Sequence, residues 1–323
     1  MAQPSNTFDS YDAVGIREDL QDVIHQISPE ETPFYSACSK MKATNVLHEW
    51  QTDSLRDSSV NAHVEGDDTT AEARTPTTRL GNYTQIFKNA VVIPDTDEGL
   101  RKAGRGREMA HQILKVGKEQ KLDIERALFD NQARVAGDST TARRLAGAPA
   151  WMTTNVAFED GGTPSGANPT GDGTDARTDD GTPVAFSQAR FDGVMQSIWE
   201  NGGKPDTVYL SAFQMDKALD FTGMNNQRST IEAGGSRNKI VRAVDVYVTP
   251  WGTIDFMPSR ENRSRDVFIM ESDKWAVANL RPMKQTPLAK TGDNTKRQVL
   301  CELTLVCKNE AASGLVADNT TTS

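Results

Sequence analysis

Two long runs of alternating apolar and polar residues constrain this chain most strongly. They cover residues 45–55 and 79–93 and are separated by an almost wholly polar stretch, 56–78. Alternation with a period of two is typical of strands. The residues predicted to share one face of a strand are Val46, His48 and Trp50 in the first run, and Tyr83, Phe87, Val91 and Ile93 in the second. We therefore expect a long antiparallel hairpin. A two-stranded ribbon is marginal alone, so it needs a surface to lie on, and a neighbouring copy of the chain is one candidate.

The strongest helix signal follows the second run. Three acidic residues mark its start, Asp95, Asp97 and Glu98, and no proline interrupts the sequence up to residue 135. We predict a long helix over 107–135 with a buried stripe of Met109, Ile113, Val116, Ile124 and Leu128. Residues 100–134, which include most of this helix, hold nine basic and five acidic residues, so this stretch carries a net charge of +4.

The start of the chain, 1–33, is acidic, with seven acids against one base, Arg17, and a net charge of −6. Leu20, Val23, Ile24 and Ile27 form one apolar helical stripe. The run Ser28–Glu31 predicts the start of a second short helix. About two turns of helix are unstable alone in water. This segment is therefore either an arm that docks elsewhere or an extension packed on its own domain. Its charge complements that of the basic helix, but charge does not decide whether the two meet within one molecule or between two.

The second half of the chain predicts a mixed domain. Residues 159–182 are rich in Gly, Thr and Asp and are expected to form an exposed loop or insertion. Downstream, helical patterns around 187–199 and 211–221 alternate with strand patterns at 207–210, 243–249, 253–257 and 267–270. A last strand is expected over 299–307, with Cys301 and Cys307 as small core residues.

Composition excludes several classes of protein. Only 36% of the residues are hydrophobic, and the formal charge is −9. An acidic chain of this kind is a poor candidate for binding nucleic acid by phosphate neutralisation or for attaching to an anionic membrane. No apolar run approaches the length of a membrane span, and the first residues lack a signal peptide, so we expect a soluble cytosolic product.

Motifs that carry chemistry are missing from the sequence. The four histidines are far apart, and three cysteines are too few for a disulfide framework or a zinc pair. Neither a nucleophile elbow nor a phosphate-binding glycine loop occurs in its proper context. The spacing of Asn168, Thr170 and Asp172 resembles a calcium loop only weakly, because Asp179 replaces the usual last Glu. We therefore predict no catalytic residue, cofactor or metal site.

The order of elements, together with several specific segments, carries a family resemblance. The order is an acidic arm, a long hairpin, a long helix, a mixed domain and a closing strand. The segments are Tyr11–Leu20, Ser28–Phe34, Trp151–Asn155, Leu280–Pro282, Pro287–Asp293, Glu302–Leu305 and Asn309–Glu310. The chain resembles the major head proteins of tailed phages typified by phage SU-ten, which have the Hong Kong 97-type fold. The resemblance spans nearly the whole chain.

The resemblance implies an α+β fold with a defined division of the chain. The expected parts are an N-terminal arm at 1–43, an extended β-hairpin loop at 44–96, a spine helix of the peripheral domain at 97–142, an axial domain at 143–280 with the insertion 159–182, and the closing strand of the peripheral domain with the C-terminus at 281–323.

The implied function is assembly of an icosahedral shell from hexamers and pentamers of this chain around packaged double-stranded DNA. Portal, scaffolding and decoration proteins are further candidate partners, and no sequence-specific DNA binding, crosslinking between subunits, cofactor or membrane is expected. The candidate contacts between subunits are Leu20, Ile24, Ile27, Trp50, Tyr83, Phe87, Lys118 and Arg126. Two alternatives stay open, an encapsulin-like compartment of the same fold and a soluble hydrolase whose site the sequence does not reveal.

Overall fold

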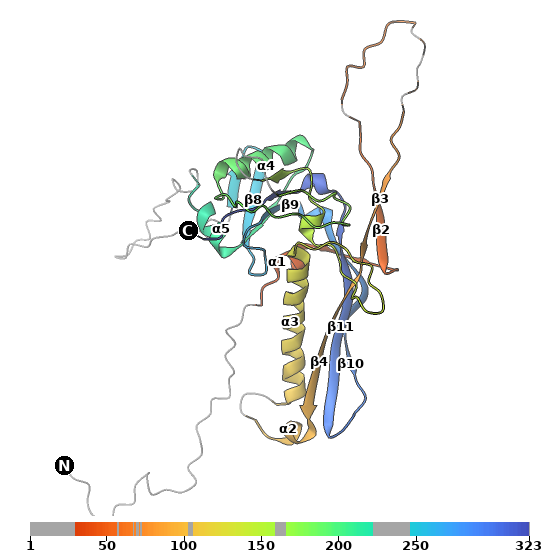
Figure 1. Ribbon diagram of the computed structural model, residues 1–323, viewed down its shortest axis with the longest axis vertical. Coiled ribbons are helices and arrows are strands. Elements are labelled where there is room, and N and C mark those ends of the chain that lie inside the picture. Colours follow the sequence, from red (N-terminus) through yellow and green to blue (C-terminus); the bar gives the residue numbers. More distant parts are fainter. Residues whose placement is uncertain are drawn as a thin grey trace, which may run out of the picture.

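The chain folds into an elongated body with a more compact domain at one end and a hairpin that projects beyond both (Figure 1). This computed structural model describes residues 30–56, 58–66, 68, 71, 73–102, 106–158, 166–221 and 246–322. The predicted stripe of Leu20, Ile24 and Ile27 therefore lies outside the described residues, as does the predicted helix start at Ser28.

The elongated body is a four-stranded sheet with a long helix beside it. The strand order is β1 (Ser39–Lys42), β10 (Trp275–Pro287), β11 (Asn294–Cys307) and β4 (Gln85–Pro94). β10, β11 and β4 are antiparallel, and β1 runs parallel to β10. The long helix α3 (Glu108–Phe129) runs along β4, preceded by the short helix α2 (Asp95–Gly99) (Figure 1).

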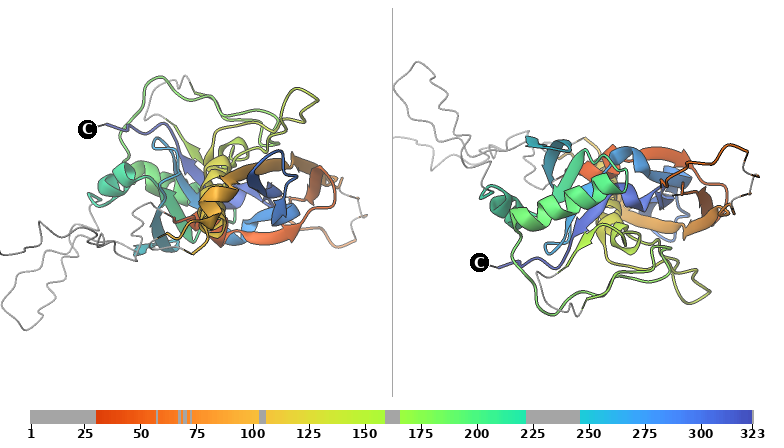
Figure 2. Two further views of the ribbon diagram at one scale, coloured as in Figure 1. Left: turned by 90° about the horizontal axis from the view of Figure 1, so that it is seen from below. Right: turned by 90° about the horizontal axis from the view of Figure 1, so that it is seen from above.

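The compact domain is built on a six-stranded mixed sheet. Its strand order is β5 (Val156–Ala157), β12 (Gly314–Val316), β9 (Val267–Met270), β6 (Thr207–Leu210), β8 (Gly252–Pro258) and β7 (Val246–Thr249). Helix α4 (Gln188–Glu200) packs against β5 and β12, and α5 (Ala212–Ala218) against β8 (Figure 2). Short 3-10 helices occur at Ala148–Ala150, Ser272–Lys274 and Glu310–Ala312. The predicted mixed domain is confirmed, and Ser187 and Ser211 cap α4 and α5 through their side chains.

An aromatic cluster joins the two bodies. Phe34 of helix α1 (Pro33–Ala37) lies 4.9 Å from Phe129 of α3 and 5.3 Å from Tyr209 of β6, measured between ring centroids. Phe129 in turn lies 5.2 Å from Phe268 of β9. Trp275 of β10 completes the cluster, 6.0 Å from Phe34. One hydrophobic core therefore runs from α3 into the six-stranded sheet.

The predicted hairpin is shorter than the sequence suggested. β2 (Leu47–Thr52) pairs with β3 (Thr78–Tyr83) over six residues, but the second run then leaves its partner at Thr84 and continues as β4 in the four-stranded sheet. The Thr84 hydroxyl donates to Glu302 of β11 at 2.7 Å, so this residue fixes the change of sheet. The apolar face of the second run is thus divided between two sheets.

The long helix also differs from its predicted bounds. α3 has 22 residues, about 33 Å, and ends at Phe129 rather than at 135. Asp130 is extended, and Gly147 packs so closely against it that an added Cβ would lie 1.9 Å from the Asp130 carbonyl oxygen. Packing against Gly147 therefore ends the helix at Phe129, although the helical pattern in the sequence continues to residue 135. Met109, Ile124 and Leu128 of the predicted stripe are buried, whereas Ile113 and Val116 are half-buried.

Two further expectations need correction. The predicted helix from Ser28 towards Tyr35 does not include residues 30–32, which are not helical; the first described helix, α1, begins at Pro33 with Thr32 at its N-cap position. The described part of the predicted exposed insertion, 166–182, is folded onto the body, with Arg177 and Asp180 almost fully buried. The Asn131 side chain explains this fold, because it accepts from the Arg177 N–H at 3.0 Å and donates to the Arg177 carbonyl at 2.7 Å.

Candidate subunit interface

The β2–β3 hairpin carries a loop, residues 53–77, that extends away from both bodies (Figure 1). Its described apolar side chains are uncovered. Leu55 is 97% exposed, Val60 is 96% exposed and Val64 is 81% exposed. Single apolar residues on a surface are ordinary, but these three all lie on one projecting loop, where another molecule can cover them.

The root of the hairpin is fixed to the body. Trp50 packs against Trp151, with ring centroids 5.3 Å apart. Asn82 is fully buried; its side-chain amide donates to the Leu305 carbonyl at 2.8 Å and accepts from the Ala146 N–H at 2.9 Å. A hairpin whose root is packed on the body while its loop stays uncovered is the arrangement expected of a segment that contacts another molecule.

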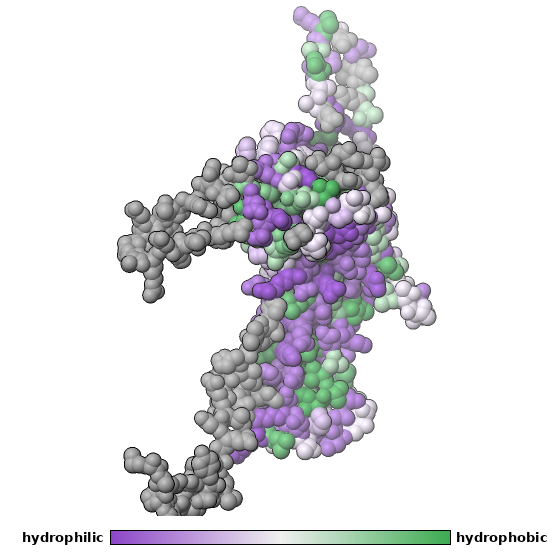
Figure 3. Space-filling model, turned by 60° about the vertical axis from the view of Figure 1, so that its left-hand side comes forward, coloured by the Kyte–Doolittle hydropathy of each residue, from purple (hydrophilic) through white to green (hydrophobic). Residues whose placement is uncertain are grey.

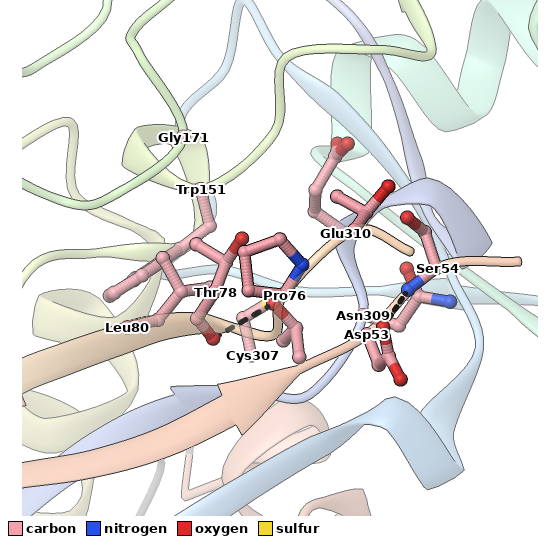
Figure 4. Close-up of a pocket in the computed structure, with 12 residues that line it drawn as sticks. Asp53, Ser54, Pro76, Thr78, Leu80, Trp151, Gly171, Cys307, Asn309 and Glu310 are labelled. Atoms are coloured by element: carbon pink, nitrogen blue, oxygen red, sulfur yellow. Dashed lines mark hydrogen bonds between the residues drawn. The ribbon is translucent and has the colours of Figure 1, made fainter. Parts of the chain in front are cut away.

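A small pocket of about 220 Å³ lies at this root, between the hairpin, Trp151 and the segment after β11 (Figure 4). Its lining includes the carboxylate of Glu310. That carboxylate accepts from the backbone N–H groups of Thr153 and Thr154, at 3.2 and 3.3 Å, and from the Thr154 hydroxyl at 2.5 Å. Glu310 therefore holds the turn at Thr153 and Thr154 in place.

Helix α1, which begins the described part of the chain, is fixed by a buried acid. The Glu125 carboxylate of α3 accepts from the Phe34 N–H at 2.9 Å and from the Tyr35 N–H at 2.7 Å. Burial raises the pKa of Glu125 to about 7, against the lowering effect of these two hydrogen bonds. The sequence reasoning missed Glu125; an acid directly after Ile124 of the buried stripe was the signal that could have revealed it.

The remaining predicted contact residues lie in different places. Lys118 and Arg126 are exposed on α3, and Tyr83 is half-buried. Phe87 was predicted as a contact between subunits, but its side chain is buried in the core of its own chain, because β4 belongs to the four-stranded sheet. Trp50 is also half-buried against its own subunit.

The described residues contain no group of three His, Cys, Asp or Glu side chains placed to hold a metal ion. All three cysteines are free and buried; burial raises the pKa of Cys38 to about 12 and that of Cys301 to about 11. Thiols of this kind are poor nucleophiles. Among the helices that the structure describes, none has the length and apolar character to span a bilayer.

Comparison with known proteins agrees with an assembly surface rather than a reaction site. The sequence model of the family described as "SU10 major capsid protein" matches residues 3–320. The "Major capsid protein" of Escherichia phage Phieco32 is 28% identical over 347 aligned residues, covering 98% of this chain and 97% of that protein.

Solved capsid structures share the fold at low sequence identity. The cyanophage A-1(L) capsid matches with a TM-score of 0.62 at 13% identity, over 97% of this chain and 99% of that one. A structure from Mycobacterium phage Cain matches with a TM-score of 0.61 at 11% identity, over 98% of this chain and 100% of that one. At such identities the likeness concerns the fold.

Proposed function

The chain belongs to the SU10 major capsid protein family, and from this premise we propose how its parts contribute to building a shell. It is a phage major capsid protein with a Hong Kong 97-type fold and a component of the virion. Its function is structural, and its copies assemble into an icosahedral shell.

The proposed division of the chain follows the two bodies, with two refinements. The four-stranded sheet with α3 forms the peripheral domain, and the six-stranded sheet with α4 forms the axial domain. Because β4 pairs with β11, the projecting part of the extended loop is limited to about residues 47–83. Because β12 pairs with β9, the end of the chain adds to the axial domain after the closing strand β11.

One observation carries the proposal for how subunits meet, namely the projecting loop with its uncovered Leu55, Val60 and Val64. We place this loop over a neighbouring subunit within a hexamer or pentamer. Each buried leucine or valine contributes about 1.5–3 kcal/mol when it leaves water. Such contacts are individually weak, but a closed shell makes many at once, so their effects multiply.

Replacing all three residues by serine tests this placement. We expect the variant to fold, since these side chains are 81–97% exposed in their own subunit. We expect it to lose closed shells, as seen by electron microscopy of the purified protein. Ser58→Ala, at an exposed polar position of the same loop, is the matched control and should leave shells intact. If the triple variant forms normal shells, these three side chains do not contribute to the contact between subunits, and the placement is refuted.

Further partners belong to the same proposal. We expect packaged double-stranded DNA to be enclosed without sequence-specific binding, because the subunit is acidic overall and repels phosphate. Strong, salt-sensitive DNA binding by empty shells would contradict this. Portal, scaffolding and decoration proteins stay candidate partners, Arg126 stays a candidate contact between subunits, and the chain is expected to have no enzymatic activity of its own.

A further inference from the structure

We propose that the amphipathic segment of the N-terminal arm, residues 17–27, docks in an apolar groove on its own subunit, along the first half of α3, and not on a neighbour. This inference deepens the proposed function, since it assigns the arm to the subunit that carries it.

The groove lies between the first half of α3 and the facing strands of the four-stranded sheet. It encloses about 640 Å³, and its apolar lining includes Ile93, Ala110, Ile113 and Leu114. Leu114 is 69% exposed, although it lies at the groove. Among the residues that the structure describes, none lies within 4 Å of the position that a Cβ on Gly117 would take, so the described helix surface beside the groove is also open. Figure 3, which brings the α3 side forward, shows hydrophobic residues on this lower part of the body.

Two contacts set the direction in which the chain enters. Glu125 accepts from the N–H groups of Phe34 and Tyr35. Further from that anchor, Lys118 Nζ donates to Glu30 Oε1 at 2.6 Å. Lys118 precedes Glu125 by seven residues, which is two turns and about 10 Å along the same side of α3. Followed toward its N-terminus, the chain therefore runs along α3 toward the start of that helix.

The arm has the length to continue on this path. After Lys118, the next residues on that side of α3 are Leu114, His111 and the N-cap residue Arg107, about 6, 10 and 16 Å further along. As a helix, the stripe from Ile27 to Leu20 spans about 10 Å, and Ile27 is only three residues from Glu30. The stripe thus comes level with the exposed Leu114 and the groove without any long connection.

Charge favours the same occupant. Arg107 and Arg297 line the groove, and Lys118 lies just beyond it. The acid in the lining, Glu98, is engaged, because its carboxylate accepts from the Met109 N–H at 3.0 Å. The acidic start of the chain, 1–33, carries a net charge of −6. A neighbour's arm with the same sequence would have the same charge, but it would have to enter where the subunit's own chain already lies at Lys118.

A disulfide between two introduced cysteines tests the docking. In Ile24→Cys/Ala110→Cys, mild oxidation of unassembled subunits and of shells should form a bond within one chain, identified by peptide mass spectrometry and by monomeric migration on a non-reducing gel. The matched control is Ile24→Cys/Glu119→Cys, because Glu119 is exposed on the opposite side of α3. The native cysteines are buried and should not compete.

The outcomes separate this inference from the proposed function. Disulfides that join two chains would overturn it in favour of an exchanged arm. Crosslinking no faster than in the Glu119 control would overturn it altogether. In either case, closed shells formed by the protein would still support the proposed function. If the unaltered protein forms no shells, the proposed function is contradicted, but the crosslinking result still decides where the arm docks.

Proteolysis gives a second readout that needs no new cysteine. Arg17 is the only tryptic site in the acidic start of the chain, 1–33. Leu114→Asp should speed cleavage after Arg17 about fivefold or more, because cleavage follows the population of undocked arm. Glu119→Gln should leave that rate unchanged. Equal rates in the two variants would mean that the groove does not hold the arm.

Discussion

Phe34 is the residue whose truncation tests the junction of the two bodies most directly. Its side chain is 2% exposed and contacts aromatic rings on α3, β6 and β10. Replacing a buried phenylalanine by alanine removes the free energy of burying the ring and leaves a cavity, which together cost about 3–5 kcal/mol. The aromatic contacts beyond burial contribute about 0.5–1.5 kcal/mol each, so we expect Phe34→Ala to lie near the upper end of that range.

The assay is urea unfolding of the unassembled subunit, followed by tryptophan fluorescence because Trp275 lies beside Phe34. With a slope of about 3 kcal/mol per molar urea, a loss near the upper end of that range should lower the midpoint by about 1.5 M. Phe34→Leu keeps most of the volume and should lower the midpoint by less than half as much.

Phe213→Ala is the matched control. Phe213 is half-buried at the surface of α5, where Lys217 lies over its ring, so its truncation should cost about 1 kcal/mol or less. A loss for Phe34→Ala no greater than for this control would refute the packing of α1 between the two bodies. It would also remove the anchor from which the arm is traced along α3.

Two further predictions concern single residues of the body. Glu125 has a pKa of about 7 in the folded chain against 4.5 as the ordinary value, so the folded state binds more protons than the unfolded state between these pH values. The free energy of unfolding should therefore fall by about 3 kcal/mol as the pH rises from about 4.5 to about 7. Glu125→Gln should remove this part of the pH dependence, and an unchanged profile of stability against pH would contradict the prediction. Gly147→Ala should lower the thermal midpoint of unfolding sharply, because the added Cβ would overlap the Asp130 carbonyl. Gly193→Ala is the contrast: Gly193 lies on the exposed side of α4 with open space among the described residues, so alanine should raise the free energy of unfolding by about 0.5–1 kcal/mol. Equal midpoints for the two variants would refute this reasoning.

Local patterns in the sequence were sufficient for most secondary structure. Strands β6 and β9 begin and end at the predicted residues, and α4 and α5 begin directly after Ser187 and Ser211, where their helical patterns were predicted to start. These elements depend on neighbours close in sequence, through side-chain periodicity and capping. The acidic first turn of α2 was visible for the same reason.

Local sequence patterns predicted only part of the candidate subunit interface. The projecting hairpin was foreseen from its alternation and its polar middle. The point where it leaves its partner was not, because that depends on Thr84 meeting Glu302, which belongs to a strand near the other end of the chain. Phe87 was predicted as a contact between subunits and lies in the core of its own chain for this reason.

The sequence by itself determined the types of element, the uneven charge and the family resemblance, since each of these is written in residues that are close together or read in order. The tertiary structure alone decided where α3 ends, which sheet receives β4 and β12, and how Glu125 holds the start of the described chain. Those outcomes depend on contacts between distant residues, whose free energies outweigh local preference and leave no periodic trace in the sequence.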